Sequence, residues 1–159
     1  HGIRVNAIGP GTIETDMEIL IPDHYITGVT ERMNQYKELD SITNEQDLSN
    51  FRERMLDRFG PIPPQTEDLF HTVRLRWLAK KIGFEKLVLR NQRLSAYFVS
   101  NPESDYYQSL QFTSILEYIK VNAIAGKMKE ERGKLIMTFT GISDIQQAVE
   151  ALKPLKFTL

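Results

Sequence analysis

The hydrophobic positions in the first half of the chain recur at the spacing of an α-helix. The clearest example is the set Leu48, Phe51, Met55 and Phe59, whose members fall along one face of a helix. A second stripe of the same kind follows Pro64, and it ends at Gly83. Its members are Leu69 or Phe70, Val73, Trp77 and Leu78. We therefore expect two consecutive helices in this region.

Polar and turn-forming residues indicate where the first of these helices begins and ends. Thr43 and Gln46 have the spacing of a capping box, in which each side chain bonds a free amide at the helix start. Gly60 suits the left-handed residue that ends many helices, and Pro61 prevents the helix from continuing. This pattern predicts a helix from about residue 44 to residue 59.

The segment before Thr43 is predicted to contain two short extended runs and one helix. Residues 3–8 alternate between apolar and polar side chains and stop at a Gly-Pro-Gly turn, as a strand does. Residues 17–21 form a second extended run before Pro22. Asp23 is expected to cap a helix in which the apolar stripe is Ile26, Val29, Met33 and Tyr36.

In the second half, the hydrophobic period changes from that of a helix to that of a strand. Residues 86–90 and 93–99 predict one hairpin, and residues 127–131 and 134–140 predict another. A helix starting at Ser104 or Asp105 separates them, and Ser143 with Gln146 caps a final helix. The predicted fold class is α+β: N-terminal helices, then a small antiparallel sheet of two hairpins with an intervening and a C-terminal helix.

Composition and charge exclude several classes of function. The chain has 20 basic and 21 acidic residues, a net charge of −1, where a protein that grips nucleic acid normally shows a basic excess. We therefore expect no direct nucleic-acid partner. No apolar run approaches the roughly 20 residues that span a membrane, so no membrane partner is expected. The absence of cysteine excludes disulfides and fits a reducing cytoplasm.

The sequence contains no motif that predicts catalysis, a cofactor or a metal. Phosphate-binding, zinc-protease, serine-hydrolase and dinucleotide-binding motifs are all absent. The three histidines, at positions 1, 24 and 71, are too scattered to suggest a shared metal site. Tyr106 and Tyr107 suit either the stacking of a partner group or packing against the sheet, and packing is the favoured interpretation.

From about residue 14 to about residue 154, the chain resembles the C-terminal domain of transcription-repair coupling factors. The most specific match is Asp-Arg-Phe-Gly-Pro-Ile-Pro at residues 57–63; residues 16–22, 51–61 and 74–83 also match. The expected division is a leader at residues 1–13 and this domain at residues 14–159.

The resemblance implies a regulatory domain of a bacterial, ATP-dependent DNA translocase rather than an enzyme in its own right. In that family, the C-terminal domain docks on an excision-protein-like module of the same parent chain. Docking covers the surface that would recruit the repair protein UvrA, so the domain is autoinhibitory. UvrA and RNA polymerase would then be indirect partners, and the protein would act in transcription-coupled repair in the cytoplasm.

The predicted interdomain contact consists of Glu53, Asp57 and Arg58. The two acids are four residues apart on the same helix, where they can meet arginines across a polar surface. Arg54 departs from the acidic residue that the family resemblance implies there. An equally favoured interpretation is that Glu53 and Asp57 pair locally with Arg54 and Arg58.

Residues 2–17 alone are similar to a late segment of short-chain dehydrogenases, which offers a second hypothesis. On this alternative, the chain is a fragment related to an NAD(P)-dependent oxidoreductase. However, no tyrosine is followed by lysine four residues later, and the glycine-rich cofactor loop is missing. Coincidence, a fusion or a sequence-assignment problem would each explain residues 1–11.

Overall fold

In the computed structural model, residues 11–123 and 126–157 are described, and their contacts divide the chain into two compact units. The first unit contains Met17–Arg74, and the second contains Leu75–Leu159 with the segment that ends at Asp16. The strand predicted at residues 3–8 lies outside the described residues. The expected boundary between residues 13 and 14 stays a prediction.

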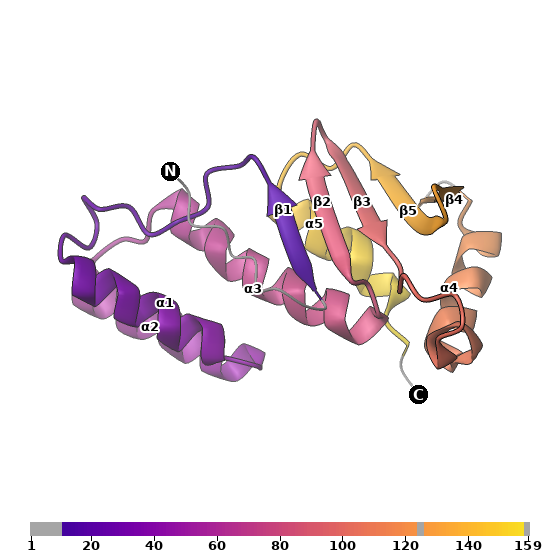
Figure 1. The fold of residues 1–159 in the computed structure, drawn as a ribbon. Helices are drawn as coiled ribbons and strands as arrows, with labels where there is room; N and C mark the ends of the chain where they lie inside the picture. The colour runs from indigo at the N-terminus through magenta and orange to yellow at the C-terminus, as the bar shows by residue number, and fades with distance from the viewer. Residues whose placement is uncertain (1–10, 124–125, 158–159) are drawn as a thin grey trace. The chain divides into compact units, whose positions relative to one another are not determined.

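The first unit is built from helices α1 (Val29–Ser41) and α2 (Glu45–Phe59) and from the first part of α3 (Pro64–Ile82) (Figure 1). Helices α1 and α2 run antiparallel. Glu31, near the start of α1, pairs with Arg58, near the end of α2, and Glu38, later in α1, pairs with the earlier Arg54. The buried side chains of this unit include Ile19, Ile21, Ile26, Leu39, Leu48, Phe51, Met55, Leu69, Phe70 and Val73.

The helix predicted from about residue 44 to residue 59 is confirmed as α2, but its cap is one residue later than expected. Asn44, not Thr43, is the N-cap, and its side-chain oxygen accepts a hydrogen bond from the Asp47 amide at 2.8 Å. The Asn44 side chain also donates to the Asp47 carboxylate at 2.9 Å. At the other end, Gly60 has a φ of +90°, as the sequence predicts for a residue that ends a helix.

The predictions for residues 17–36 were largely wrong. Residues 17–21 form no strand; they are loop in which Ile19 and Ile21 are buried. The helix begins at Val29 rather than after Asp23, and its N-cap is Gly28, which has no side chain to bond the first amides. Val29 is 65% exposed and Met33 46%, so neither belongs to a buried stripe. The buried residue of α1 is Leu39.

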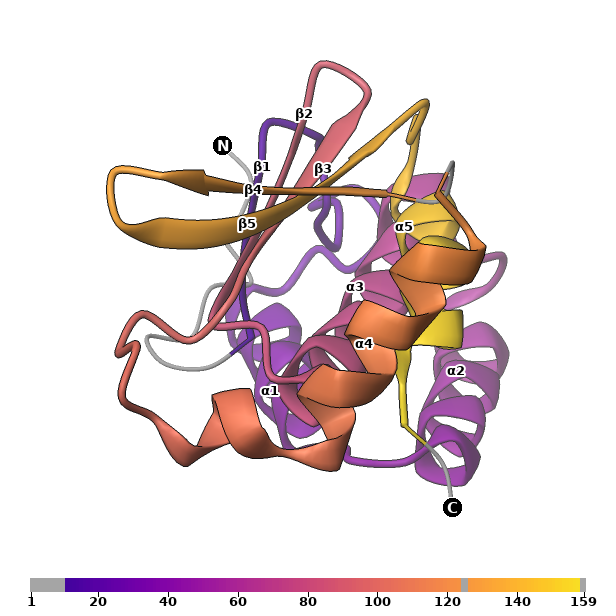
Figure 2. The ribbon, with the colours of Figure 1, turned by 90° about the vertical axis from the view of Figure 1, so that its right-hand side faces the viewer.

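The second unit contains a five-stranded sheet in the order β1-β2-β3-β5-β4 (Figures 1 and 2). The strands are β1 (Thr12–Thr15), β2 (Lys86–Arg90), β3 (Arg93–Tyr97), β4 (Lys127–Glu131) and β5 (Lys134–Thr140). Both predicted hairpins are confirmed, and so is the α+β class. The sheet is mixed rather than antiparallel, however, because β1 pairs with β2 in parallel.

One face of the sheet supplies the core of this unit. In strand register, Leu87 lies opposite Ala96, which lies opposite Met137, and all three are buried. Helices α4 (Leu110–Val121) and α5 (Ile145–Leu152) lie on that side of β2 and β3 (Figure 2). Alternate residues point to the opposite face, since side-chain direction reverses at each step along a strand.

The predicted helix at residue 104 is divided into two parts. A short 3-10 turn, Asp105–Gln108, is followed by α4, whose N-cap is Ser109. Tyr106 donates a hydrogen bond to the Ile82 carbonyl at 2.8 Å, and its ring contacts Phe98 and Phe112. The tyrosine pair therefore packs within the unit, as favoured. For α5, Asp144 is the N-cap in place of the predicted Ser143.

Candidate protein-interaction surface on helix α2

The side chains of helix α2 face three environments: the core of the first unit, helix α3 and the solvent. Leu48, Phe51 and Met55 are each about 1% exposed and face the core of the first unit. Arg52 points towards α3, where its guanidinium forms two hydrogen bonds with the Glu67 carboxylate. Residues on the remaining side of α2 face away from the core, and Glu53 and Asp57 are among them. Each turn of the helix is thus fixed by contacts on its inner side.

The arginines next to the predicted acids are held by helix α1. Arg58 lies 2.6 Å from Glu31, and its guanidinium carbon is 4.8 Å from the centre of the Phe59 ring. Arg54 lies 2.9 Å from Glu38. The alternative of local pairing with Glu53 and Asp57 is therefore not what the structure shows. Sequence reasoning missed the α1 acids, because nothing in α2 indicates which neighbour its arginines face.

Glu53 and Asp57 are left exposed on the outer side of the helix. Among the described residues, neither carboxylate has an ion pair within 4.0 Å. They are four residues apart, so they project in nearly the same direction. The three residues of the predicted contact are thus close along one helix. The two acids have no ion pair among the described residues, whereas Arg58 already pairs with Glu31.

Electrostatics within the first unit reinforce this arrangement. The hydrogen bonds that Arg52 donates to the Glu67 carboxylate raise the pKa of Arg52 above its usual value, with a smaller contribution from the nearby charge of Glu53. Burial raises the pKa of Tyr25, whose hydroxyl donates to the Gly60 carbonyl at 2.8 Å. This hydrogen bond joins the end of α2 to the loop that precedes α1. As a result, the outer face of α2 is presented on a well-anchored helix.

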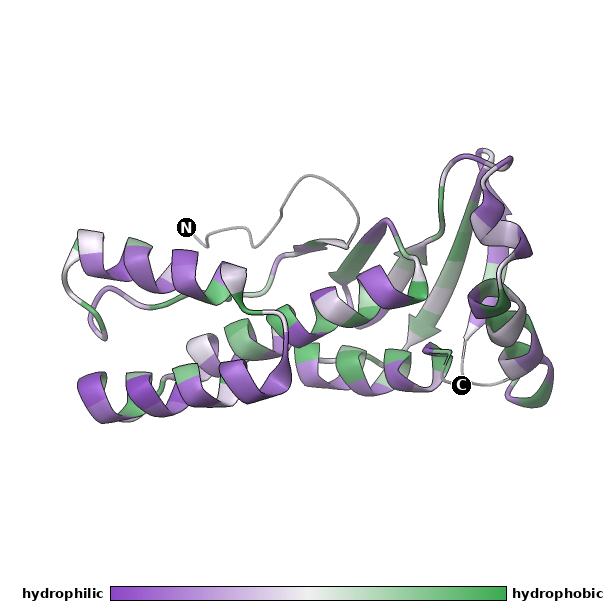
Figure 3. Ribbon diagram, turned by 90° about the horizontal axis from the view of Figure 1, so that it is seen from below, coloured by the Kyte–Doolittle hydropathy of each residue, from purple (hydrophilic) through white to green (hydrophobic). Residues whose placement is uncertain are grey.

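The described residues contain no group of three or more histidine or acidic side chains placed to hold a metal ion. The Arg74 guanidinium lies 3.1 Å from Nδ1 of His71, within hydrogen-bond distance. This contact gives His71 a structural role. Nor is any helix within the described ranges long and apolar enough to cross a membrane. The outer side of α1 and α2 is mostly hydrophilic (left side of Figure 3).

A family model described as the TRCF domain matches residues 15–109. The chain belongs to this family. The matched stretch begins at the end of β1 and includes the whole first unit of helices after Asp16, α2 with its exposed acids among them. The resemblance to this family is thereby confirmed, and residues 57–63 lie within the matched stretch.

Curated relatives carry the same family name at low to moderate identity. The chain is 36% identical over 75 residues to the transcription-repair-coupling factor of Escherichia coli, covering 47% of this chain and 6% of that protein. It is 29% identical over 76 residues to that of Rickettsia conorii, covering 48% of this chain and 7% of that protein. The matched part of the chain therefore spans less than a tenth of the length of these two relatives.

The fold agrees with a solved structure over nearly the whole chain. The crystal structure of the C-terminal domain of a transcription-repair coupling factor superposes with a TM-score of 0.73, covering 94% of both chains at 15% identity. This likeness extends beyond residue 109, where the family match ends. The second unit, with its five-stranded sheet, therefore belongs to the same fold.

Proposed function

We propose that this domain is a non-catalytic, autoinhibitory domain of an ATP-dependent DNA translocase that acts in transcription-coupled repair. It docks on an excision-protein-like module of the same parent chain and covers the surface that this module offers to UvrA. Membership of the TRCF domain family supports the assignment to repair. UvrA and RNA polymerase are then partners of the parent rather than of this domain.

The exposed acids of α2 are the observation that carries this proposal. Glu53 and Asp57 lie on the outer face of a helix whose inner face is buried. Because Arg54 and Arg58 are engaged by Glu38 and Glu31, the two acids are not neutralised by their neighbours. A carboxylate pair of this kind fits arginines on a partner, which can bind each acid through two hydrogen bonds.

The contact is expected to be polar and reversible. Interfaces between domains of one chain are smaller and more polar than permanent ones. In the parent chain the two domains are tethered, which gives each a high effective concentration near the other. The affinity between the separated domains is therefore expected to be low. Such a contact can be released when the parent engages a stalled polymerase.

Calorimetric titration of this chain with the excision-protein-like module tests the proposal. We expect saturable binding that weakens as salt rises, because exposed charges are screened. Asp57→Arg should weaken binding at least tenfold, since a charge pair at an interface becomes a repulsive one. Asp23→Arg is the matched control: it makes the same charge change at an exposed position of the first unit outside α2.

Two results would contradict the docking surface. Equal weakening by Asp57→Arg and Asp23→Arg would show a general effect of charge rather than a contact on α2. Full binding by the double variant Glu53→Arg/Asp57→Arg would exclude the acids from the interface. A change of a module arginine to aspartate that restores binding of Asp57→Arg would identify the direct partner of Asp57.

A further inference from the structure

The net charge of −1 includes two parts of the chain whose opposite charges cancel in the sum. Residues 17–74 contain eleven acidic and six basic side chains, whereas residues 75–159 contain eight acidic and thirteen basic ones. The basic excess is therefore concentrated in the part that forms β2 to β5, and the acidic excess in the part that forms α1 and α2. The expectation of no direct nucleic-acid partner rests on the whole-chain balance, which says little about what either part attracts.

Much of the basic excess lies on one face of the sheet. The side chains that alternate with the buried core residues point to the face opposite α4 and α5. Six of them are basic, and we call them the basic face: Lys86, Arg90, Arg93, Lys127, Lys129 and Lys134. Only two acids of the described strands share this face, Glu14 and Glu131.

Most of these cations are not neutralised within the described residues. Glu131 pairs with Lys129 at 3.0 Å, and Glu14 lies 4.0 Å from Arg90. No carboxylate within 4.0 Å is recorded for Lys86, Arg93, Lys127 or Lys134 in the described part of the chain. Strands lie about 4.8 Å apart, and alternate residues about 6.7 Å apart along a strand. The face is therefore a closely spaced array of positive charge.

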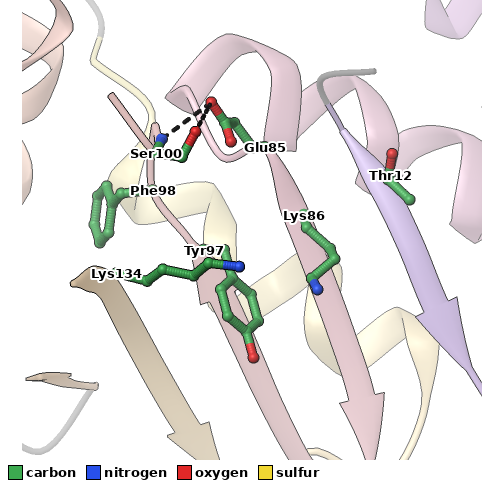
Figure 4. Close-up of a pocket in the computed structure, with 7 residues that line it drawn as sticks. All are labelled: Thr12, Glu85, Lys86, Tyr97, Phe98, Ser100 and Lys134. Carbon is green, nitrogen blue, oxygen red and sulfur yellow. Dashed lines mark hydrogen bonds between the residues drawn. The ribbon is translucent and has the colours of Figure 1, made fainter. Parts of the chain in front are cut away.

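An aromatic ring and a hollow lie within this array (Figure 4). A cavity of about 430 Å³ is lined by Thr12, Glu85, Lys86, Tyr97, Phe98, Ser100 and Lys134. The Lys86 ammonium is 4.5 Å from the centre of the Tyr97 ring, and the Lys134 side chain extends towards the same ring. The one acid in the cavity, Glu85, accepts a hydrogen bond from the Ser100 amide at 3.1 Å.

We propose that the basic face binds single-stranded nucleic acid, with phosphates on its lysines and arginines and a base against Tyr97. Repeated cations suit a repeated anion, and phosphate contacts give affinity without sequence preference. An aromatic ring can stack any unpaired base. Tyr97 is half-buried, and the Lys86 ammonium over its ring would lie beside the phosphate of a stacked nucleotide. A folded acidic protein fits less well, because stable protein interfaces need a buried apolar centre. In the register, Tyr97 lies between Lys86 of β2 and the buried Ile136 of β5. The exposed strand residues of this face include the cations Arg90, Arg93, Lys127 and Lys134.

Fluorescence anisotropy of a labelled oligothymidylate, titrated with the whole chain at several salt concentrations, tests this proposal. For Lys86→Gln/Lys134→Gln, we expect weaker binding and a salt slope reduced by about 1.4, which is the loss of two phosphate contacts on a single strand. Tyr97→Leu should lower the affinity about fivefold or more with little change in slope. Thermal unfolding followed by circular dichroism shows whether each variant is folded.

A matched control has the same loss of two positive charges elsewhere in the second unit. Lys120 and Lys153 are exposed and pair with Glu117 and Glu150 within their own helical segments. Lys120→Gln/Lys153→Gln should leave the salt slope unchanged. An equal effect of both double variants would overturn the proposal, as would failure of the whole chain to bind at low salt.

Two competition results would also overturn it. Displacement of the oligonucleotide by polyglutamate at the same charge concentration as unlabelled oligothymidylate would show that the face takes an acidic polypeptide. Binding of a duplex as tightly as the single strand would exclude a role for an unpaired base. None of these outcomes depends on the docking of α2, so failure here leaves the autoinhibitory function standing.

Discussion

Arg52 of α2 and Glu67 of α3 form a two-pronged ion pair, in which Nε donates to Oε1 at 2.8 Å and Nη2 donates to Oε2 at 3.1 Å. Both side chains are more than a third exposed, at 40% and 37%, so water weakens the pair. The pair joins α2 to α3 but is expected to add little stability.

Glu67→Gln should therefore lower the free energy of unfolding by only about 0.5 kcal/mol, the range of exposed ion pairs. Urea denaturation measures this change, and 1 M salt should reduce it. Glu18→Gln removes an acid that has no ion pair among the described residues and serves as the control. A loss above about 2 kcal/mol would mean that Glu67 behaves as a buried charge.

Phe51→Ala should be the most destabilising of the substitutions considered in α2. Phe51 is 1% exposed, and its ring meets Phe70 edge-on at 6.0 Å between ring centres. Truncation leaves a cavity, and the expected cost is about 3–5 kcal/mol. Leu56→Ala, on the same helix at 42% exposure, should cost well under 1 kcal/mol in the same urea experiment. Similar costs for the two would contradict the assigned inner face.

Asn44→Ala should destabilise the chain by about 1 kcal/mol, because Asn44 caps α2. Thr43→Ala should change stability by no more than a few tenths, although the sequence pattern favours Thr43 as the cap. Thermal unfolding of the two variants side by side measures the difference. If Thr43→Ala proved the costlier change, the start of α2 would have to be moved by one residue.

Gly83→Ala should destabilise the second unit by about 2–4 kcal/mol. Gly83 has a φ of +103°, where a side chain is strained, and an added Cβ would collide with the Tyr106 ring. Gly133→Ala is the matched control, since its φ is +77° and a Cβ there would meet nothing within 4 Å. It should cost about 1 kcal/mol from strain alone. Equal costs would mean that the Tyr106 ring moves aside freely.

Stability should fall at alkaline pH because of Tyr106. Burial raises the pKa of this tyrosine far above its ordinary value, so the folded chain keeps it neutral while the unfolded chain ionises near pH 10. Its contribution is complete below about pH 10 and is lost as the pH rises towards the folded-state value. Urea unfolding at pH 8 and pH 11 should show a smaller decline for Tyr106→Phe than for the unmodified chain.

The sequence predicted the two hairpins well because their signals are local. The alternation of side chains indicates which face of β2 and β3 is buried, and Leu94 and Ala96 lie on that face. The start of α1 was mispredicted because Val29 and Met33 are apolar but exposed. Hydrophobic spacing alone cannot separate an apolar residue in the core from one at the surface.

The availability of the α2 acids could not have been predicted from α2 alone. Whether Asp57 is free depends on whether Arg58 is engaged, and Arg58 is engaged by Glu31, which lies 27 positions earlier in the sequence. The basic face was missed for a related reason. Its residues come from separate strands, and they gather only once the register of Lys86 with Tyr97 is known.

The parallel pairing of β1 has a consequence for how the chain folds. Thr12 pairs with Lys86, so nearly the entire first unit is synthesised between two neighbouring strands of one sheet. Closing so long a loop is entropically costly and slow compared with hairpin formation. During synthesis on the ribosome, β1 therefore stays unpaired until β2 has been made, while α1 and α2 emerge first. The sheet is completed late, after the helical unit has had time to fold.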